Sequence, residues 1–410
     1  MSRFGLLAIV MLLVLPVVPA QAAEPAAPAD FHPWRGVDLL VKGQRDGLVP
    51  GLRGLRIGRP AGTVEHTEPQ TGTRTYEYGT WTSPSYRPGF DATQLVASWN
   101  ATTPKGTWLR VDMRGRTTAG AETIWYGMGQ WASGDSDVTR TSLPGQSDDY
   151  GYIDVDTFVG KTTLRAYQLR VTLYRAKGTH ESPTLSMAGA MTSAIPDRFS
   201  VPTSGPGGAW GIELPVRPYS QNIHIGQYPE YGGGGEAWCS PTSTQMVVEY
   251  WGKRPSKQDL SWVAPSYADP SVDHAARYTY DKDYDGTGNW PFNTAYAATY
   301  GLNAHVTRLR SLTELEGYIK RGIPVITSQS FLASELDGAG YGTSGHIMVV
   351  IGFTRTGDVI VNDPASSSNS EVRNVYKRAQ FENIWQRTKR YRADGTVAGG
   401  PGGVAYIITR

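Results

Sequence analysis

The stretch "EAWCSPTSTQMVVEYWG", residues 236–252, predicts a helix that starts beside Cys239, the only cysteine of the 410-residue chain. Ser240 is a good helix cap, Pro241 suits the first helical position, and Gly252 suits the helix end. The free backbone N–H groups and the dipole at a helix N-terminus favour a thiolate over a thiol. Free cysteines are also among the most buried residues in proteins. The position of Cys239 at the helix start is therefore compatible with two roles, a nucleophile and a packed side chain.

The sequence after this helix mixes helical and strand patterns, which predicts an α+β arrangement over residues 212–410. A capped helix is expected where Ser311 precedes Glu314 by three positions. Three apolar runs predict strands: PVITSQSF (324–331), HIMVVIGFT (346–354) and DVIVNDPA (358–365). Because helices and strands do not alternate as βαβ units, we expect an antiparallel sheet.

One of the seven histidines, His346, follows a glycine at the start of an apolar strand. A nucleophilic thiol needs a general base, and histidine is the usual one near neutral pH. The next predicted strand ends at Asp363, and the turn at 354–358 would fold the two strands into a hairpin, so that both side chains come within reach. A carboxylate there would orient the imidazole. Three alternatives remain open. His346 packs without a catalytic role, Asp363 belongs to an ordinary Asp-Pro turn, or Asn362 orients the imidazole instead of Asp363.

Taken together, Gln221 in "LPVRPYSQ", Cys239 in "WCSPTS", "GHIMVVIGF" and "VIVNDPA" resemble the papain-like cysteine peptidases of family 39. This family includes the peptidases that remove double-glycine bacteriocin leaders. The resemblance covers the C-terminal half only. It implies a papain-like fold, Cys239 as nucleophile, His346 as base, Asp363 as the orienting residue and Gln221 as oxyanion donor, with no cofactor. Gln227 lies closer to the cysteine in the sequence and competes with Gln221 for the last role.

The chain departs from the leader peptidases in ways that bear on function. Ser240 stands where the family usually has glycine, and the sequence contains no Walker pattern. The resemblance is therefore to the secreted, stand-alone members, and it implies a peptide or protein substrate. Two other functions stay open. One is transfer of the acyl group from the thiol to an amine, as in transglutaminases, and the other is a non-catalytic protein whose N-terminal half binds glycan or cell-wall polymer.

The N-terminal half, residues 61–200, reads as an all-β antiparallel sandwich of the jelly-roll kind. In "TWLRVDMRG" (107–115), for example, apolar and polar residues alternate with the period of a strand that has one apolar face. Six further runs have similar patterns: 73–81, 93–101, 122–132, 151–158, 162–176 and 182–194. Prolines and glycines in 201–211 predict a linker, so we expect two domains.

Residues 1–22 have the pattern of a secretory signal peptide, with an early arginine, an apolar run and a small-residue cleavage site. The Pro/Ala-rich residues after it predict a flexible lead-in over 23–60. We therefore expect a secreted protein with no membrane-spanning segment after cleavage. With Lys+Arg 39 against Asp+Glu 37, the net charge is +2, which argues against nucleic acid as a partner.

The acidic stretch "DKDYDG" (281–286) imitates the start of a calcium loop through Asp281, Asp283 and Asp285. The twelfth position of such a loop needs a bidentate glutamate, and here it is Phe292, so an EF-hand is excluded. A looser metal site and a solvated acidic turn remain as interpretations. Trp290 and Phe292 either line the substrate cleft or pack beside it.

Overall fold

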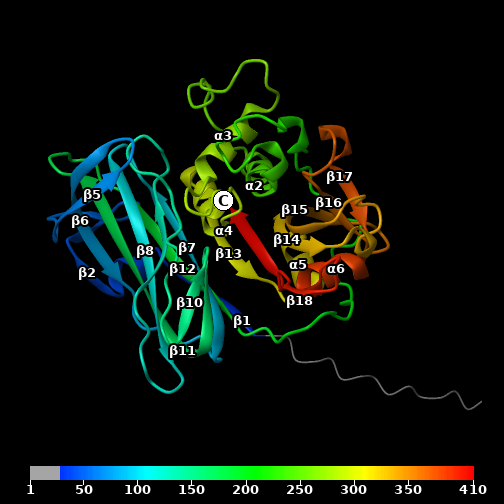
Figure 1. Ribbon diagram of the computed structural model, residues 1–410, viewed down its shortest axis with the longest axis horizontal. Helices are drawn as coiled ribbons and strands as arrows, with labels where there is room; N and C mark the ends of the chain where they lie inside the picture. The colour runs from blue at the N-terminus through cyan, green and yellow to red at the C-terminus, as the bar shows by residue number, and fades with distance from the viewer. Residues whose placement is uncertain (1–27) are drawn as a thin grey trace, which may run out of the picture.

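The computed structural model describes residues 28–410, and the predicted signal peptide lies outside these residues. The N-terminal part is one large antiparallel sheet, and most helices belong to the C-terminal part, which lies beside it (Figure 1). The expected β-rich N-terminal half and helix-containing C-terminal half are confirmed at this level. None of the helices within 28–410 is both long enough and apolar enough to cross a membrane.

The N-terminal sheet has 12 strands, and every pairing in it is antiparallel. Its strands are β1 (Ala29–Arg35), β2 (Gln44–Asp46), β3 (Leu48–Gly51), β4 (Gly54–Ile57), β5 (Gly62–Glu68), β6 (Gly72–Thr82), β7 (Ala92–Thr102), β8 (Thr107–Thr117), β9 (Tyr126–Trp131), β10 (Gly151–Asp154), β11 (Thr157–Ala176) and β12 (Thr184–Ser193). The apolar face predicted in β8 is buried, since Leu109, Val111 and Met113 are fully covered. The predicted strand over 151–158 is instead a hairpin, because the chain turns at Val155 and Asp156 between β10 and β11.

The flexible lead-in expected over residues 23–60 is wrong for the described part of that range. Strand β1 pairs with β12 along its whole length, and it is followed by the short helix α1 (Val37–Val41) and by strands β2 to β4. Trp34, Leu39 and Leu55 are buried in the core of the sheet. Burial of these apolar side chains supplies the free energy that orders the segment. The elements are too short to produce a recognisable periodic pattern in the sequence.

The C-terminal part has a six-stranded antiparallel sheet in the order β13-β20-β14-β15-β16-β17. Its strands are β13 (Asn303–Arg308), β14 (Val325–Phe331), β15 (Thr343–Phe353), β16 (Val359–Asn362), β17 (Arg373–Tyr376) and β20 (Val404–Thr409), with β18 (Lys389–Tyr391) and β19 (Val397–Gly399) as a separate pair. The α-helices are α2 (Cys239–Tyr250), α3 (Pro270–Thr279), α4 (Trp290–Thr299), α5 (Leu312–Ile319) and α6 (Arg378–Gln386). The three predicted strands and the cap of α5, where Ser311 accepts from Glu314 N–H, are confirmed.

The two parts of the chain share a packed seam. Helix α4 lies against β7, and Phe292 at its start packs on Trp99 and Trp131 of the large sheet, with ring centroids 6.0 and 5.4 Å away. Asn100 of β7 donates to the carbonyl of Ala304 in β13 at 2.7 Å. Phe292 therefore packs in the seam and does not line the cleft. Because the aromatic contacts are apolar and buried, they hold α4 in a fixed place against the sheet.

Candidate active site

Cys239 is the first residue of α2 and is half-buried. The helix begins two residues earlier than it would with Ser240 as its cap: Trp238 takes the cap position, and the Ser240 hydroxyl bonds the Tyr406 hydroxyl at 3.0 Å. Cys239 lines a cavity of about 970 Å³ that His346 and Gln221 also line. The structure therefore brings the lone thiol to a solvent-connected cavity at a helix N-terminus, and not into the core.

His346 and Asp363 meet as the hairpin predicts. His346 lies in β15, Asp363 directly follows β16, and the two strands pair antiparallel. The imidazole Nε2 is 2.8 Å from Asp363 Oδ1, and both side chains are buried. Cys239 lies near enough to the ring to contribute to its raised pKa. Because Nε2 is taken by the carboxylate, Nδ1 is the nitrogen left for the thiol.

The environment of His346 favours its protonated form. Burial, the largest influence, lowers the pKa of the ring, but the charge and hydrogen bond of Asp363 and the contact with Cys239 outweigh it and raise that pKa to about 10. Burial pushes the pKa of Asp363 upward, yet the charge and hydrogen bond of His346 and the other donors hold it below its usual value. The two groups therefore form a buried imidazolium–carboxylate pair at neutral pH.

Two tyrosines that the sequence analysis did not identify complete the surroundings of Asp363. The hydroxyls of Tyr341 and Tyr376 donate to its Oδ2 at 2.9 and 2.8 Å, and the backbone N–H of Ala365 donates to Oδ1 at 3.0 Å. The ring of Tyr341 also meets His346 edge-on, with centroids 5.6 Å apart. The carboxylate is thus fixed by four donors, so its orientation toward the imidazole does not depend on the histidine alone.

The structure also separates the alternatives for the remaining site residues. Gln221 is buried at the wall of the Cys239 cavity, where its amide donates to the carbonyl of Glu236 at 2.8 Å. Gln227 does not line that cavity, and its side chain meets His224 at 3.1 Å. Asn362 points elsewhere, since its amide donates to the carbonyl of Val216. Gln221 and Asp363, and not Gln227 and Asn362, are therefore in place beside the thiol and the imidazole.

The acidic loop does not gather its carboxylates around one point. Asp281 is buried and accepts from Ser142 and Asn289, whereas Asp283 and Asp285 are exposed. Within residues 28–410, no three His, Cys, Asp or Glu side chains form a group that could hold a metal ion. The loop instead ties the two parts of the chain together through Asp281.

Further residues of the cavity wall come from segments that the sequence analysis did not connect with the site. Asp154, at the tip of the β10–β11 hairpin, brings the N-terminal part to the cavity. Trp290 and Tyr284 line it from the segment that leads into α4, and Gln329 and Ser330 line it from β14. Gln329 lies opposite His346 in the strand register. A register prediction for β14 and β15 would have found Gln329, but no sequence signal linked residue 154 to this site.

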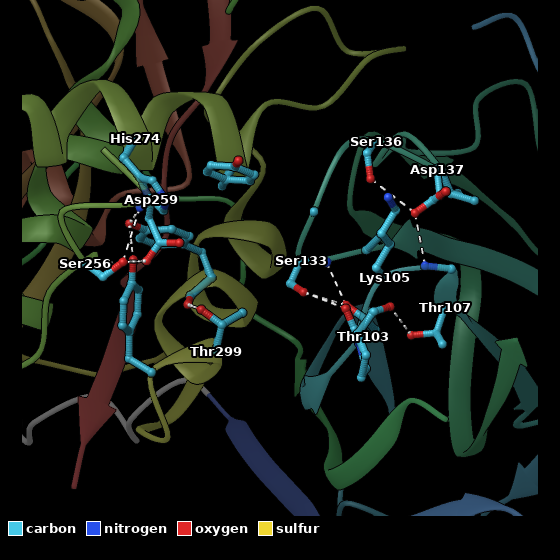
Figure 2. Close-up of a pocket in the computed structure, with 18 of the residues that line it drawn as sticks. Thr103, Lys105, Thr107, Ser133, Ser136, Asp137, Ser256, Asp259, His274 and Thr299 are labelled. Carbon is cyan, nitrogen blue, oxygen red and sulfur yellow. Dashed lines mark hydrogen bonds between the residues drawn. The ribbon is translucent and has the colours of Figure 1, made fainter. Parts of the chain in front are cut away.

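A second cavity of about 590 Å³ opens at the seam between the two parts. Figure 2 shows its polar side chains in two groups that face each other, one from the helical part and one from the sheet. Within each group the side chains bond their own neighbours: Ser256 bonds Asp259 at 2.7 Å, and Ser136 bonds Asp137 at 3.1 Å. The only imidazole in this wall, His274, contacts the Tyr296 hydroxyl at 3.0 Å, and burial lowers its pKa to about 4. This cavity lacks the thiol and the paired imidazole of the first.

Comparisons with known proteins follow the same division of the chain. The family model for the peptidase C39 N-terminal domain matches residues 30–193, and the model for the peptidase C39-like family matches residues 213–393. Among curated proteins, the comparison finds none that matches the chain. A crystal structure described as a C39-like peptidase from Bacillus anthracis is 18% identical, with 48% of this chain and 97% of that chain covered and a TM-score of 0.30. A structure of the infectious bursal disease virus Gt strain is 12% identical, with 44% of this chain and 36% of that chain covered and a TM-score of 0.20.

The family matches extend the resemblance seen in the sequence, which was limited to the C-terminal half. Both parts of the chain correspond to parts of C39 peptidases, so the large sheet is included in the match. The chain belongs to the C39-like peptidase family.

Proposed function

We propose that this chain is an exported cysteine peptidase that hydrolyses a peptide or amide bond through a thioester at Cys239. The observation that carries the proposal is the arrangement of one thiol, one imidazole and one carboxylate: His346 bonds Asp363 at 2.8 Å through Nε2, and it lines the same cavity as Cys239, which contributes to its raised pKa. A nucleophile, a base and a group that orients the base are what acyl transfer by a thiol requires.

In the proposed reaction, the Cys239 thiolate attacks the carbonyl carbon of the scissile bond and forms a tetrahedral intermediate. The protonated His346 then gives its proton to the leaving nitrogen, and the C–N bond breaks to leave a thioester. His346 next removes a proton from a water molecule, whose oxygen attacks the thioester and releases the carboxylic acid. Asp363 holds the ring in place and stabilises its charge throughout.

The finer description of the fold belongs to the same proposal. We interpret the C-terminal part as a papain-like domain, because α2 carries the thiol and the antiparallel sheet carries the His–Asp pair. We interpret the N-terminal part as a sandwich-type accessory domain that helps to build the substrate cleft. The support for this role is Asp154, which that part contributes to the wall of the cavity.

The test of the proposal is the reactivity of Cys239. We expect iodoacetamide at pH 6 to alkylate the wild-type thiol at least about tenfold faster than the thiol of a His346→Gln variant, because the protonated ring, with its raised pKa, places a positive charge near the attacking sulfur. Intact-mass spectrometry measures this rate without interference, since the chain has one cysteine. Equal, slow alkylation of both proteins would contradict the proposed nucleophile.

The role of Gln221 can be tested against Gln227, which serves as a matched control. Loss of one oxyanion donor typically lowers the rate about 10²–10³-fold. We therefore expect Gln221→Ala to reduce kcat by about this factor and Gln227→Ala to change it less than about threefold. Thermal unfolding of both variants checks that each is folded at the assay temperature. A larger effect at Gln227 than at Gln221 would reverse the assignment.

A further inference from the structure

The cavity beside Cys239 is lined by carboxylates from three separate segments. Asp154 comes from the β10–β11 hairpin, Glu236 precedes α2, and Asp285 precedes α4. All three residues are exposed, and the lining contains neither lysine nor arginine. The imidazolium of His346 and the carboxylate of Asp363 balance each other's charge, so these three acidic residues determine the sign of the potential that a substrate meets.

Buried hydrogen-bond acceptors without partners occur in the same wall. Gln329 is fully buried, and its amide nitrogen donates to Thr327 Oγ1 at 2.6 Å. That bond leaves Gln329 Oε1 free, and among residues 28–410 it has no hydrogen-bond partner. The neighbouring Ser330 hydroxyl is also buried and lacks a partner within the described chain. Leaving a buried acceptor unpaired is costly, so Gln329 Oε1 in this wall points to a ligand that supplies a donor, whereas the Ser330 hydroxyl can either donate or accept.

Two arginines that bond backbone carbonyls of this wall do not offset its charge. Arg387 donates to the carbonyl of Ser330 at 2.9 Å from behind the wall, and its guanidinium is paired with Glu335 at 2.5 Å. Arg308 is buried and donates to the carbonyl of Pro401. Neither side chain lines the cavity. The surface that faces a ligand therefore keeps an excess of acceptors and negative charge.

We infer that this cavity selects peptides with a lysine or arginine side chain next to the scissile bond. Ammonium and guanidinium groups are the side-chain ends that carry only donors and a positive charge, which matches a wall of carboxylates and unpaired acceptors. The carboxylates do not form a group that could hold a metal ion within residues 28–410, so an organic cation fits them better. The inference rests on the proposed function and adds a substrate class to it.

The single cysteine allows the charge preference to be measured without a known substrate. The full chain is treated with two methanethiosulfonates, one with a trimethylammonium group and one with a sulfonate group, and the rate of mixed-disulfide formation at Cys239 is followed by mass spectrometry. After normalisation to free cysteine, we expect the cationic reagent to react about tenfold faster than the anionic one at low salt, and we expect this ratio to shrink as salt is added.

Variants of Asp154 test whether the carboxylates cause this preference. Asp154→Lys should lower the ratio of the cationic to the anionic reaction rate at least about threefold, because it replaces one negative charge of the wall with a positive one. Asp149→Asn is the control, since Asp149 is exposed in the same region and lies outside the lining.

A second measurement uses a library of peptides from a proteome digested with a protease that cuts after glutamate. We expect the wild-type chain to cut beside lysine or arginine in a large majority of cases, and Asp154→Lys to lose this bias.

The outcomes distinguish the inference from the proposed function. A reactive Cys239 that shows no charge preference, or cleavage with no basic residue beside the cut, would overturn the inference and leave the peptidase in place. A thiol that reacts like free cysteine, together with no cleavage of any peptide, would overturn the proposed function itself.

Discussion

Replacing Cys239 by alanine is expected to reduce peptide hydrolysis to background, a fall in kcat of about 10⁶-fold. Loss of the nucleophile from a catalytic triad has an effect of this size, because no other group can form the acyl-enzyme. The chain has no second cysteine to take over. The measurement is single-turnover cleavage of the best substrate found in the peptide library, followed until the wild type has converted it completely.

Two controls make this result specific. Cys239→Ser replaces the thiol with a hydroxyl of similar size at the start of α2, and its activity should fall by several orders of magnitude because a serine hydroxyl is a far weaker nucleophile beside this imidazolium. Thermal unfolding should be nearly unchanged in both variants, since Cys239 is only half-buried. Retention of more than about a tenth of wild-type activity by the alanine variant would rule out the thioester mechanism.

The His–Asp pair could be predicted because it depends on local order in the chain. His346 and Asp363 lie at the open end of one hairpin, so a turn and two apolar strands were enough to bring them together. Gln221 required the family resemblance, since residues of its loop carry no periodic pattern. Its position is determined by a backbone bond to the carbonyl of Pro364, a contact between segments far apart in the sequence.

The donors around Asp363 and the carboxylate wall could not be predicted in the same way. Tyr341 reaches Asp363 from the loop that precedes β15, and Tyr376 reaches it from β17, and a buried tyrosine in such a segment usually packs in the core. Asp154 reaches the cavity only because the chain turns at Val155, which has a φ of 52°. A residue with a β-branched side chain is disfavoured in that conformation, so the sequence read as one continuous strand.

The largest error in the predicted fold, the flexible lead-in over residues 23–60, has a similar cause. Strand β1 contains Pro33 and β2 has three residues, features that argue against regular strands when each is considered alone. Both are stabilised by long partners, since β1 pairs with β12 and β2 with β6. Tertiary pairing therefore overrode local preference at the edge of the sheet, where proline is tolerated.

Asp363→Asn is expected to lower kcat about 10⁴-fold, as the loss of the corresponding carboxylate does in serine-protease triads. Asparagine keeps the shape of the side chain but removes the negative charge that holds the His346 ring protonated and oriented. Asp358→Asn is a matched control, because Asp358 belongs to the same hairpin and pairs with Lys377 at 3.0 Å, away from the cavity. That variant should retain nearly full activity, and an equal loss in both would indicate damage to the hairpin.

The pH dependence separates this role from a structural one. In the wild type, His346 has a raised pKa of about 10, so kcat/KM should fall on the alkaline side as the pH rises through about 10. Without Asp363, burial dominates and the pKa of His346 drops, so the alkaline fall should move to lower pH. The same linkage governs stability. The raised pKa of His346 contributes its full stabilisation of the fold below pH 6.5, and this stabilisation is lost as the pH rises through about 10. The lowered pKa of Asp363 contributes its full stabilisation above pH 3.8. The variant should therefore be most destabilised, relative to the wild type, between pH 3.8 and pH 6.5, and this difference should shrink as the pH rises through about 10. An alkaline limb at the same pH in both proteins would mean that the carboxylate does not control the ionisation of His346.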